Sequence, residues 1–172
     1  MQQEELGTTC EGLLFRVFHR PQINNDASCS VVALTSPHPG AGVTQITSLL
    51  TETLRRDGNQ SVISICAREL SSGESGQSTQ KNLSSALEAI RHKYRYVLID
   101  CGPMREQNAI RLAPLVDGII LVLEANRTQA EQIRYVEKTL ESVNGRILGH
   151  VLNKRTYVIP TWFHRMMDAV GI

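Results

Sequence analysis

The 172-residue chain has the length of one domain, and its 41% hydrophobic and 20% charged residues are ordinary for a soluble globular protein. Its net charge of +1 gives no electrostatic reason to expect nucleic acid or an anionic membrane as a partner. No apolar stretch is long enough to span a bilayer, and MQQEELGTT lacks the features of a secretion signal. We therefore expect a cytoplasmic protein without direct membrane insertion.

Hydrophobic periodicity predicts alternating strands and helices along the chain. The predicted strands are residues 30–36, 61–66, 96–100, 117–125 and 146–153. The predicted helices are residues about 8–19, 43–57, 83–90, 108–116, 130–143 and about 160–170. An exposed loop rich in Ser and Gly is expected over 69–82. This alternation favours one domain over 1–172, an α/β fold with three layers, in which helices cover both faces of a mostly parallel sheet.

The four cysteines give no metal or disulfide signal. Cys10, Cys29, Cys66 and Cys101 are widely spaced, with no C-x-x-C pair and no histidine at ligand spacing. We expect them to pack as small hydrophobic side chains.

The stretch SPHPGAGVT, residues 36–44, has the features of a phosphate-binding loop. Gly40 and Gly42 allow successive backbone N–H groups to turn inward, and the helix behind them points its positive end at an anion. In the pattern G-x-x-x-x-G-K-[ST], Thr44 stands at the hydroxyl that holds Mg²⁺, but Val43 replaces the lysine and Pro37 the first glycine. Loss of one charge-assisted contact costs about 1.5–3 kcal/mol of binding.

Four motifs in order resemble the bacterial tyrosine kinases of capsule and exopolysaccharide synthesis, relatives of the Min and Par partition ATPases. The resemblance runs from about Glu11 to Arg155 and implies a P-loop NTPase-like fold, truncated in this chain. Its loop S-x-x-P-G-E-G-K-S is matched by Ser36, Pro39, Gly40, Gly42 and Thr44, with Ala41 and Val43 as departures. YVLIDCGP resembles its I-I-D-x-P-P strand, VDGIILVLE its A-D-G strand, and LGHVLN its G-x-V-x-N strand.

The resemblance implies roles for particular residues. Asp100 occupies the position of the Walker B type aspartate, which orients water and magnesium beside the γ-phosphate. Asn153 occupies the position of the asparagine that contacts adenine in the partition ATPases. A vestigial nucleotide site would then consist of Gly40, Ala41, Gly42, Val43, Thr44 and Asn153. If Mg²⁺ binds at all, Thr44 and Asp100 are the residues expected to hold it.

Other family features are missing from the sequence. The family's second acidic motif, of D-x-D type, is replaced by Ile65, Cys66, Ala67 and Arg68, with Glu69 as the nearest acid. The N-terminal E-x-x-R-x-x-R signature, implicated in ring assembly, reads Glu11, Leu14 and Val17. Of the C-terminal tyrosine cluster only Tyr157 remains.

Each candidate residue also has a structural interpretation. Gly40 and Gly42 could serve only the turn, Thr44 could cap the helix, and Asp100 could cap the turn before Gly102. For Asn153, a polar residue ending a strand is at least as good an interpretation as a base contact. His38 is expected to face solvent.

Two hypotheses follow for function. In the first, the chain is a pseudokinase with a degenerate Walker A loop, needs no cofactor, and is a regulatory or scaffold partner in exopolysaccharide or capsule synthesis. The resemblance implies a membrane-anchored polysaccharide co-polymerase or a catalytic kinase relative as its partner, at the inner face of the membrane, and we also consider homo-oligomers. In the second, the chain is an active ATPase or tyrosine kinase that binds ATP and Mg²⁺ with a cation from Arg68, Lys154, Arg155 or a second subunit. A sensor of small anions that uses the bare loop is a third option.

Overall fold

The computed structural model describes residues 29–56, 61–70 and 80–155. The predicted helices at about 8–19 and 160–170 lie outside these residues, as do Cys10 and Tyr157. The expectation of one domain over 1–172 therefore remains a prediction.

Twelve elements follow one another in the described residues. The strands are β1 (Ser30–Ser36), β2 (Val62–Cys66), β3 (Tyr96–Pro103), β4 (Gly118–Glu124) and β5 (Ile147–Asn153). The helices are α2 (Val43–Arg56), α3 (Ala67–Leu70), α4 (Gln80–Arg91), α5 (Asn108–Leu112) and α6 (Ala130–Ser142), with 3-10 turns η1 (Met104–Glu106) and η2 (Ala113–Leu115).

The strands form one five-stranded parallel sheet in the order β2-β3-β1-β4-β5. β1 lies at its centre, as its continuous apolar run predicts, and Val31, Val32, Ala33 and Leu34 are fully buried. All five predicted strands are present.

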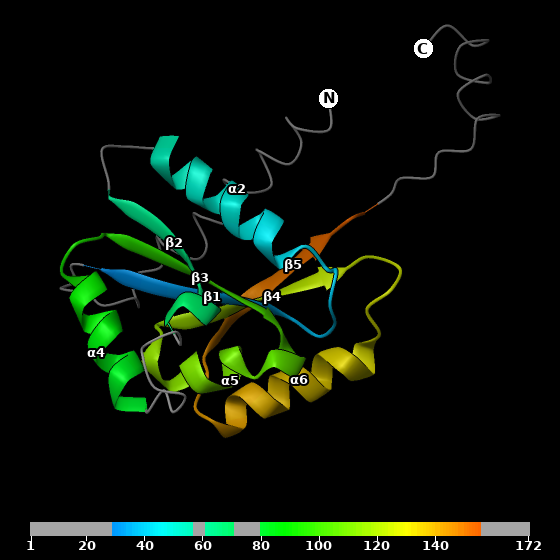
Figure 1. Ribbon diagram of the computed structural model, residues 1–172. Coiled ribbons are helices and arrows are strands. Elements are labelled where there is room, and N and C mark those ends of the chain that lie inside the picture. Colours follow the sequence, from blue (N-terminus) through cyan, green and yellow to red (C-terminus); the bar gives the residue numbers. More distant parts are fainter. Residues whose placement is uncertain (1–28, 57–60, 71–79, 156–172) are drawn as a thin grey trace, which may run out of the picture.

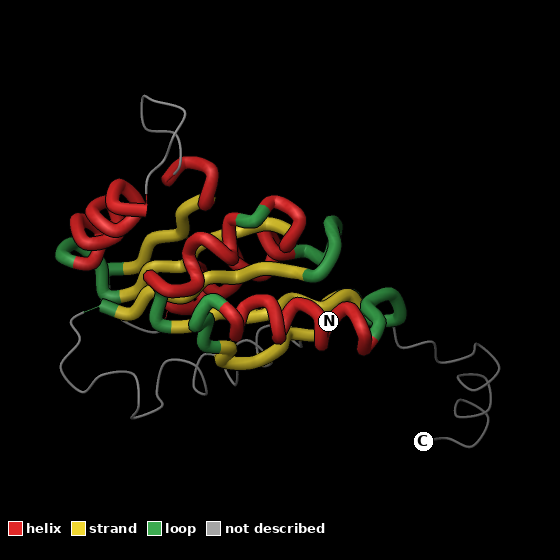
Figure 2. The backbone as a smooth tube through the Cα atoms, turned by 90° about the horizontal axis from the view of Figure 1, so that it is seen from below, coloured by secondary structure: helices red, strands yellow, loops and turns green. Residues whose placement is uncertain are grey.

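Helices cover both faces of this sheet (Figures 1 and 2). Helix α2 packs on one face, where Leu50 and Leu54 join an apolar cluster with Leu34 and Leu98. Helices α4, α5 and α6 pack on the opposite face, where buried residues of alternate strand positions form a second cluster. The predicted three-layer α/β architecture, with a mostly parallel sheet, is confirmed.

The carboxylate of Asp117 links two elements at the amino end of the sheet. Asp117 Oδ2 accepts a hydrogen bond from the buried Val31 N–H at 2.6 Å and contacts Arg91 Nη1 at 3.1 Å. The aspartate of the VDG motif therefore ties the end of α4 to the central strand.

The structure differs from the prediction after β2. Residues 67–70 form the short helix α3, whereas a loop was expected from Glu69. The turn is held because Ala67 is 2% exposed in the core and Arg68 pairs with Glu106. Neither contact has a signal in the local sequence.

Candidate functional site

Parallel pairing brings the carboxyl ends of all strands to one edge, where open α/β sheets place their ligands. Every site residue predicted from the sequence lies at this edge: Gly40, Ala41, Gly42, Val43, Thr44, Asp100 and Asn153. Their distances and burial show which of them touch.

The loop between β1 and α2 depends on its glycines. Gly40 has φ +86° and Gly42 has φ +94°, a region that other residues adopt only with strain. A Cβ at Gly42 would also stand 2.2 Å from Asn153 Nδ2. The turn therefore requires glycine at both positions, as the structural interpretation expects, and a role of these residues in binding a nucleotide stays a prediction.

Thr44 and Asp100 are in direct contact. Thr44 Oγ1 donates a hydrogen bond to Asp100 Oδ2 at 2.5 Å, and the Gly102 N–H donates to Asp100 Oδ1 at 2.9 Å. Asp100 thus caps the turn before Gly102 and also meets the hydroxyl at the start of α2. Thr44 lies within the first turn of α2, which begins at Val43.

Val43 faces the protein interior. It is 6% exposed and belongs to the same apolar cluster as Ala41, Leu34 and Ile46. The position at which the family pattern carries a lysine is therefore part of the hydrophobic core.

Two consecutive residues at the end of β5 hold two consecutive carbonyls of the loop. Asn153, 7% exposed, donates from Nδ2 to Ala41 O at 2.8 Å. Lys154 Nζ donates to Gly40 O at 2.6 Å. This bracing agrees with the structural interpretation of Asn153; its contact with a base stays a prediction.

Three basic side chains surround the carboxylate of Glu124 at the end of β4. Its carboxylate lies 3.2 Å from Lys154 Nζ, 3.1 Å from Arg127 Nη1 and 3.8 Å from His38 Nδ1. Burial raises the pKa of Glu124, but the hydrogen bonds and charges of Lys154 and Arg127 outweigh it, so that the pKa is lowered. Glu124 was not predicted from the sequence, although its place at a strand's carboxyl end is the same signal that identified Asp100.

His38 does not face solvent as expected. Its side chain is 13% exposed, and Nε2 lies 3.0 Å from Thr128 Oγ1. The expectation was wrong because Thr128 and Glu124, distant in sequence, cover the ring.

Arg68 and Glu106 form an ion pair next to Asp100. Arg68 Nη2 lies 2.7 Å from Glu106 Oε1, and Nε lies 3.3 Å from Oε2. Arg68 follows β2, whose last residue, Cys66, pairs with Asp100. Arg68 is one of the four residues that the resemblance aligns with the family's second acidic motif; Glu106 was not identified from the sequence.

The cysteines within the described residues are unbridged. Cys29 and Cys101 are buried and Cys66 is partly buried, so the packing interpretation is confirmed for the first two. Burial raises the pKa of the Cys101 thiol, which keeps it neutral.

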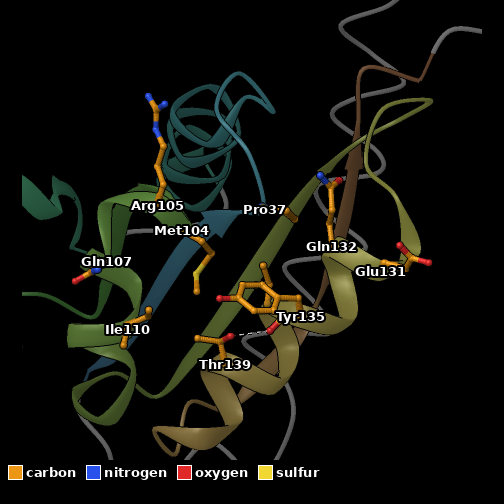
Figure 3. Close-up of a pocket in the computed structure, with 10 residues that line it drawn as sticks. Pro37, Met104, Arg105, Gln107, Ile110, Glu131, Gln132, Tyr135 and Thr139 are labelled. Atoms are coloured by element: carbon orange, nitrogen blue, oxygen red, sulfur yellow. Dashed lines mark hydrogen bonds between the residues drawn. The ribbon is translucent and has the colours of Figure 1, made fainter.

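A groove opens beside the loop (Figure 3). Its volume is about 570 Å³, and it lies between η1 and α5 on one side and α6 on the other, with Pro37 at its edge. Met104 and Tyr135 point into it, whereas Arg105 points away. Tyr135 is 72% exposed, which is high for a large aromatic side chain.

In the part of the chain that the structure describes, no helix has the length and apolarity needed to cross a membrane.

The sequence is similar to known proteins over part of its length. It is 32% identical over 73 residues to the succinoglycan biosynthesis transport protein ExoP of Rhizobium meliloti, and 30% identical over 77 residues to the tyrosine-protein kinase CpsD of Streptococcus agalactiae. These matches cover 42% and 44% of this chain, but only 9% of ExoP and 33% of CpsD. No protein-family model matches the chain.

Solved structures show the same fold. The kinase domain of the Escherichia coli tyrosine kinase ETK superposes with a TM-score of 0.67 at 18% identity, over 87% of this chain and 75% of that one. The MinD cell division protein of Aquifex aeolicus gives 0.61 at 18% identity, over 83% and 73%. The chain thus has the P-loop NTPase-like fold of a tyrosine-kinase domain and is distantly related in sequence to bacterial tyrosine kinases.

Proposed function

We propose that the chain is a catalytically degenerate, tyrosine-kinase-like P-loop protein that transfers no phosphate and acts as a regulatory or scaffold partner. Its setting would be bacterial exopolysaccharide or capsule synthesis, as its relation to ExoP and CpsD suggests. The partner would be a membrane-anchored polysaccharide co-polymerase or a catalytic kinase relative, which would bring this protein from the cytoplasm to the membrane.

The observation that carries this proposal is the burial of Val43. A lysine at this position neutralises charge that grows on the phosphates during transfer. Here the side chain is buried, with 6% of the residue exposed, and packed against apolar residues, so it offers neither a cation nor a hydrogen-bond donor. Transfer should suffer more than binding, because the missing cation would stabilise charge that develops only in the transition state.

The charges that remain at the loop are paired with one another. Lys154 contacts both Gly40 O and Glu124 Oε1, and Arg127 also contacts Glu124. To reach a phosphate, Lys154 would have to leave both of these partners, which opposes its use as a replacement for the lysine.

Calorimetry with ATP and Mg²⁺ on the purified protein tests the proposal. We expect no binding in the micromolar range and no release of ADP, with the kinase domain of a relative run as positive control. Micromolar binding together with turnover that Asp100→Ala abolishes would defeat the proposal.

The second candidate, an active ATPase or kinase, has one observation in its favour. Lys154 Nζ lies 2.6 Å from Gly40 O, so a cation does lie at the loop, although it comes from the residue that follows β5. If this lysine serves catalysis, Lys154→Met should abolish turnover, whereas Arg155→Met should leave it unchanged.

A further inference from the structure

An ion pair between Arg68 and Glu106 joins the segments that follow the carboxyl ends of β2 and β3. Arg68 comes from α3 and Glu106 from η1, the segments that directly follow these two strands. Two nitrogen–oxygen contacts, at 2.7 and 3.3 Å, orient the guanidinium against the carboxylate. The side chain of Arg68 is 72% exposed and that of Glu106 is 22% exposed, so the bridge lies at the mouth of the site.

Glu106 is also held from its other side. Asn108 Nδ2 donates to Glu106 Oε2 at 3.4 Å, and a Cβ at Gly102 would stand 3.1 Å from the same oxygen. Gly102 has φ +63° and donates its N–H to Asp100. The carboxylate of Glu106 is therefore packed against the turn that Asp100 caps.

Asp100 has both of its oxygens in use within the protein. Oδ2 accepts from Thr44 and Oδ1 from the Gly102 N–H. The pKa of Arg68 is raised, first by its hydrogen bond with Glu106 and then by the charge of Glu106, with smaller contributions that include the charge of Asp100. The geometric link is indirect: Glu106, which holds the guanidinium of Arg68, packs against Gly102, and Gly102 donates its N–H to Asp100.

A divalent cation does not fit this arrangement. Mg²⁺ requires oxygen ligands in near-octahedral geometry, and carboxylates supply the negative charge that it needs. Within the described residues no group of three or more His, Cys, Asp or Glu side chains could hold a metal ion. Arg68, two residues beyond the strand partner of Asp100, adds a positive charge to this edge of the sheet and pairs with the neighbouring carboxylate of Glu106.

We propose that Arg68, held by Glu106, acts as a built-in cation that excludes divalent metal from the neighbourhood of Asp100. This inference rests on the proposed function, because it concerns the same site, but it assigns the loss of the metal to a residue outside the phosphate loop. Restoring a lysine at position 43 would then not restore metal binding.

Replacement of Arg68 by an acid should create the missing site. In Arg68→Asp, Glu106 loses its partner, and three carboxylates then stand at adjoining strand ends. Mn²⁺ binds carboxylates as Mg²⁺ does and is paramagnetic, so free and bound Mn²⁺ can be distinguished by electron paramagnetic resonance. We expect Arg68→Asp to bind one Mn²⁺ at least tenfold more tightly than the wild type, in the absence of any nucleotide.

Three further variants make the test specific. Arg146→Asp has the same change of charge at an exposed position outside the carboxyl edge and should show no gain. Arg68→Asp combined with Asp100→Asn should lose the gain. Arg68→Gln, which removes only the cation and keeps a long polar side chain, should show a smaller gain of about threefold, and circular dichroism would confirm that each variant is folded.

The inference is overturned if the wild type binds Mn²⁺ as tightly as Arg68→Asp does, or if Arg146→Asp gains as much. It is also overturned if Arg68→Gln, once shown to be folded, gains nothing. These outcomes are separate from the test of the proposed function, which measures ATP binding and turnover by the wild type. A wild type that binds ATP in the micromolar range and turns it over in a way that Asp100→Ala abolishes would end the proposed function whatever Mn²⁺ does.

Discussion

Thr44 Oγ1 donates a hydrogen bond to Asp100 Oδ2 at 2.5 Å, across 56 residues of sequence. The bond joins the first turn of α2 to the end of β3, so the start of the helix and the central sheet share one polar contact.

Removal of the Thr44 hydroxyl should therefore cost stability. We expect Thr44→Val to lower the free energy of unfolding by about 1–1.5 kcal/mol, because a charged acceptor loses its donor at an exposed position. Thr44→Ser keeps the hydroxyl and should stay within about 0.5 kcal/mol of the wild type. Urea unfolding measures both; a Thr44→Val variant as stable as Thr44→Ser would contradict the prediction.

Gly42 should tolerate no side chain. In Gly42→Ala the added Cβ meets Asn153 Nδ2 and the backbone is strained at φ +94°, so we expect a loss of about 2–4 kcal/mol. Gly149→Ala is the matched control, since nothing lies within 4 Å of its Cβ, and it should stay within about 0.5 kcal/mol. Thermal or urea unfolding of the two variants would contradict this prediction if their losses were equal.

Restoration of the loop lysine should damage the fold. Val43→Lys places an ammonium at a position that is 6% exposed, and we expect a loss of about 1–3 kcal/mol in urea unfolding. Ser48→Lys, on the exposed side of the same helix, is the control and should change stability by less than about 0.5 kcal/mol. A stable Val43→Lys variant that also binds ATP would instead indicate that the loop remains competent.

Glu124 should make stability depend on pH. Its folded pKa lies below the ordinary value of 4.5, so its charged form stabilises the folded protein above that pH, and the contribution is lost as pH falls through the folded pKa. The wild type should therefore exceed Glu124→Gln in stability at pH 6, with the difference shrinking below about pH 4.5. Urea midpoints from pH 6 to about 3.5 measure this.

A second variant identifies the cause of that pH dependence. Lys154→Met removes a main source of the lowered pKa and should flatten the profile as well. Parallel profiles for the wild type and Glu124→Gln over the whole range would refute the prediction.

Much of the fold follows from local pattern. Every residue of the run VVALT is either apolar or β-branched, which suits a strand covered on both faces. The strand β1 is indeed central. Glycine in the loop and Asp100 at a strand end were also predictable, because parallel strands bring such positions to one edge.

The partners of these residues were less predictable. Lys154 meets Gly40 across 114 residues and Arg68 meets Glu106 across 38, and no periodicity links such positions. His38 was misjudged for the same reason, since its cover comes from Thr128, 90 residues away. Side-chain pairing at a sheet edge depends on rotamers and on short segments such as helix α3. A single sequence specifies neither of these.

The bracing of Ala41 and Gly40 by Asn153 and Lys154 has a consequence for how the molecule is made. A ribosome completes the loop more than a hundred residues before it adds the two side chains that hold it, at separations of 112 and 114 residues. Contacts that close so large a stretch of chain form late, because the entropy of closure must first be overcome. The loop should therefore acquire its final shape only when β5 joins the sheet, and a nascent chain that stops short of Asn153 should lack it.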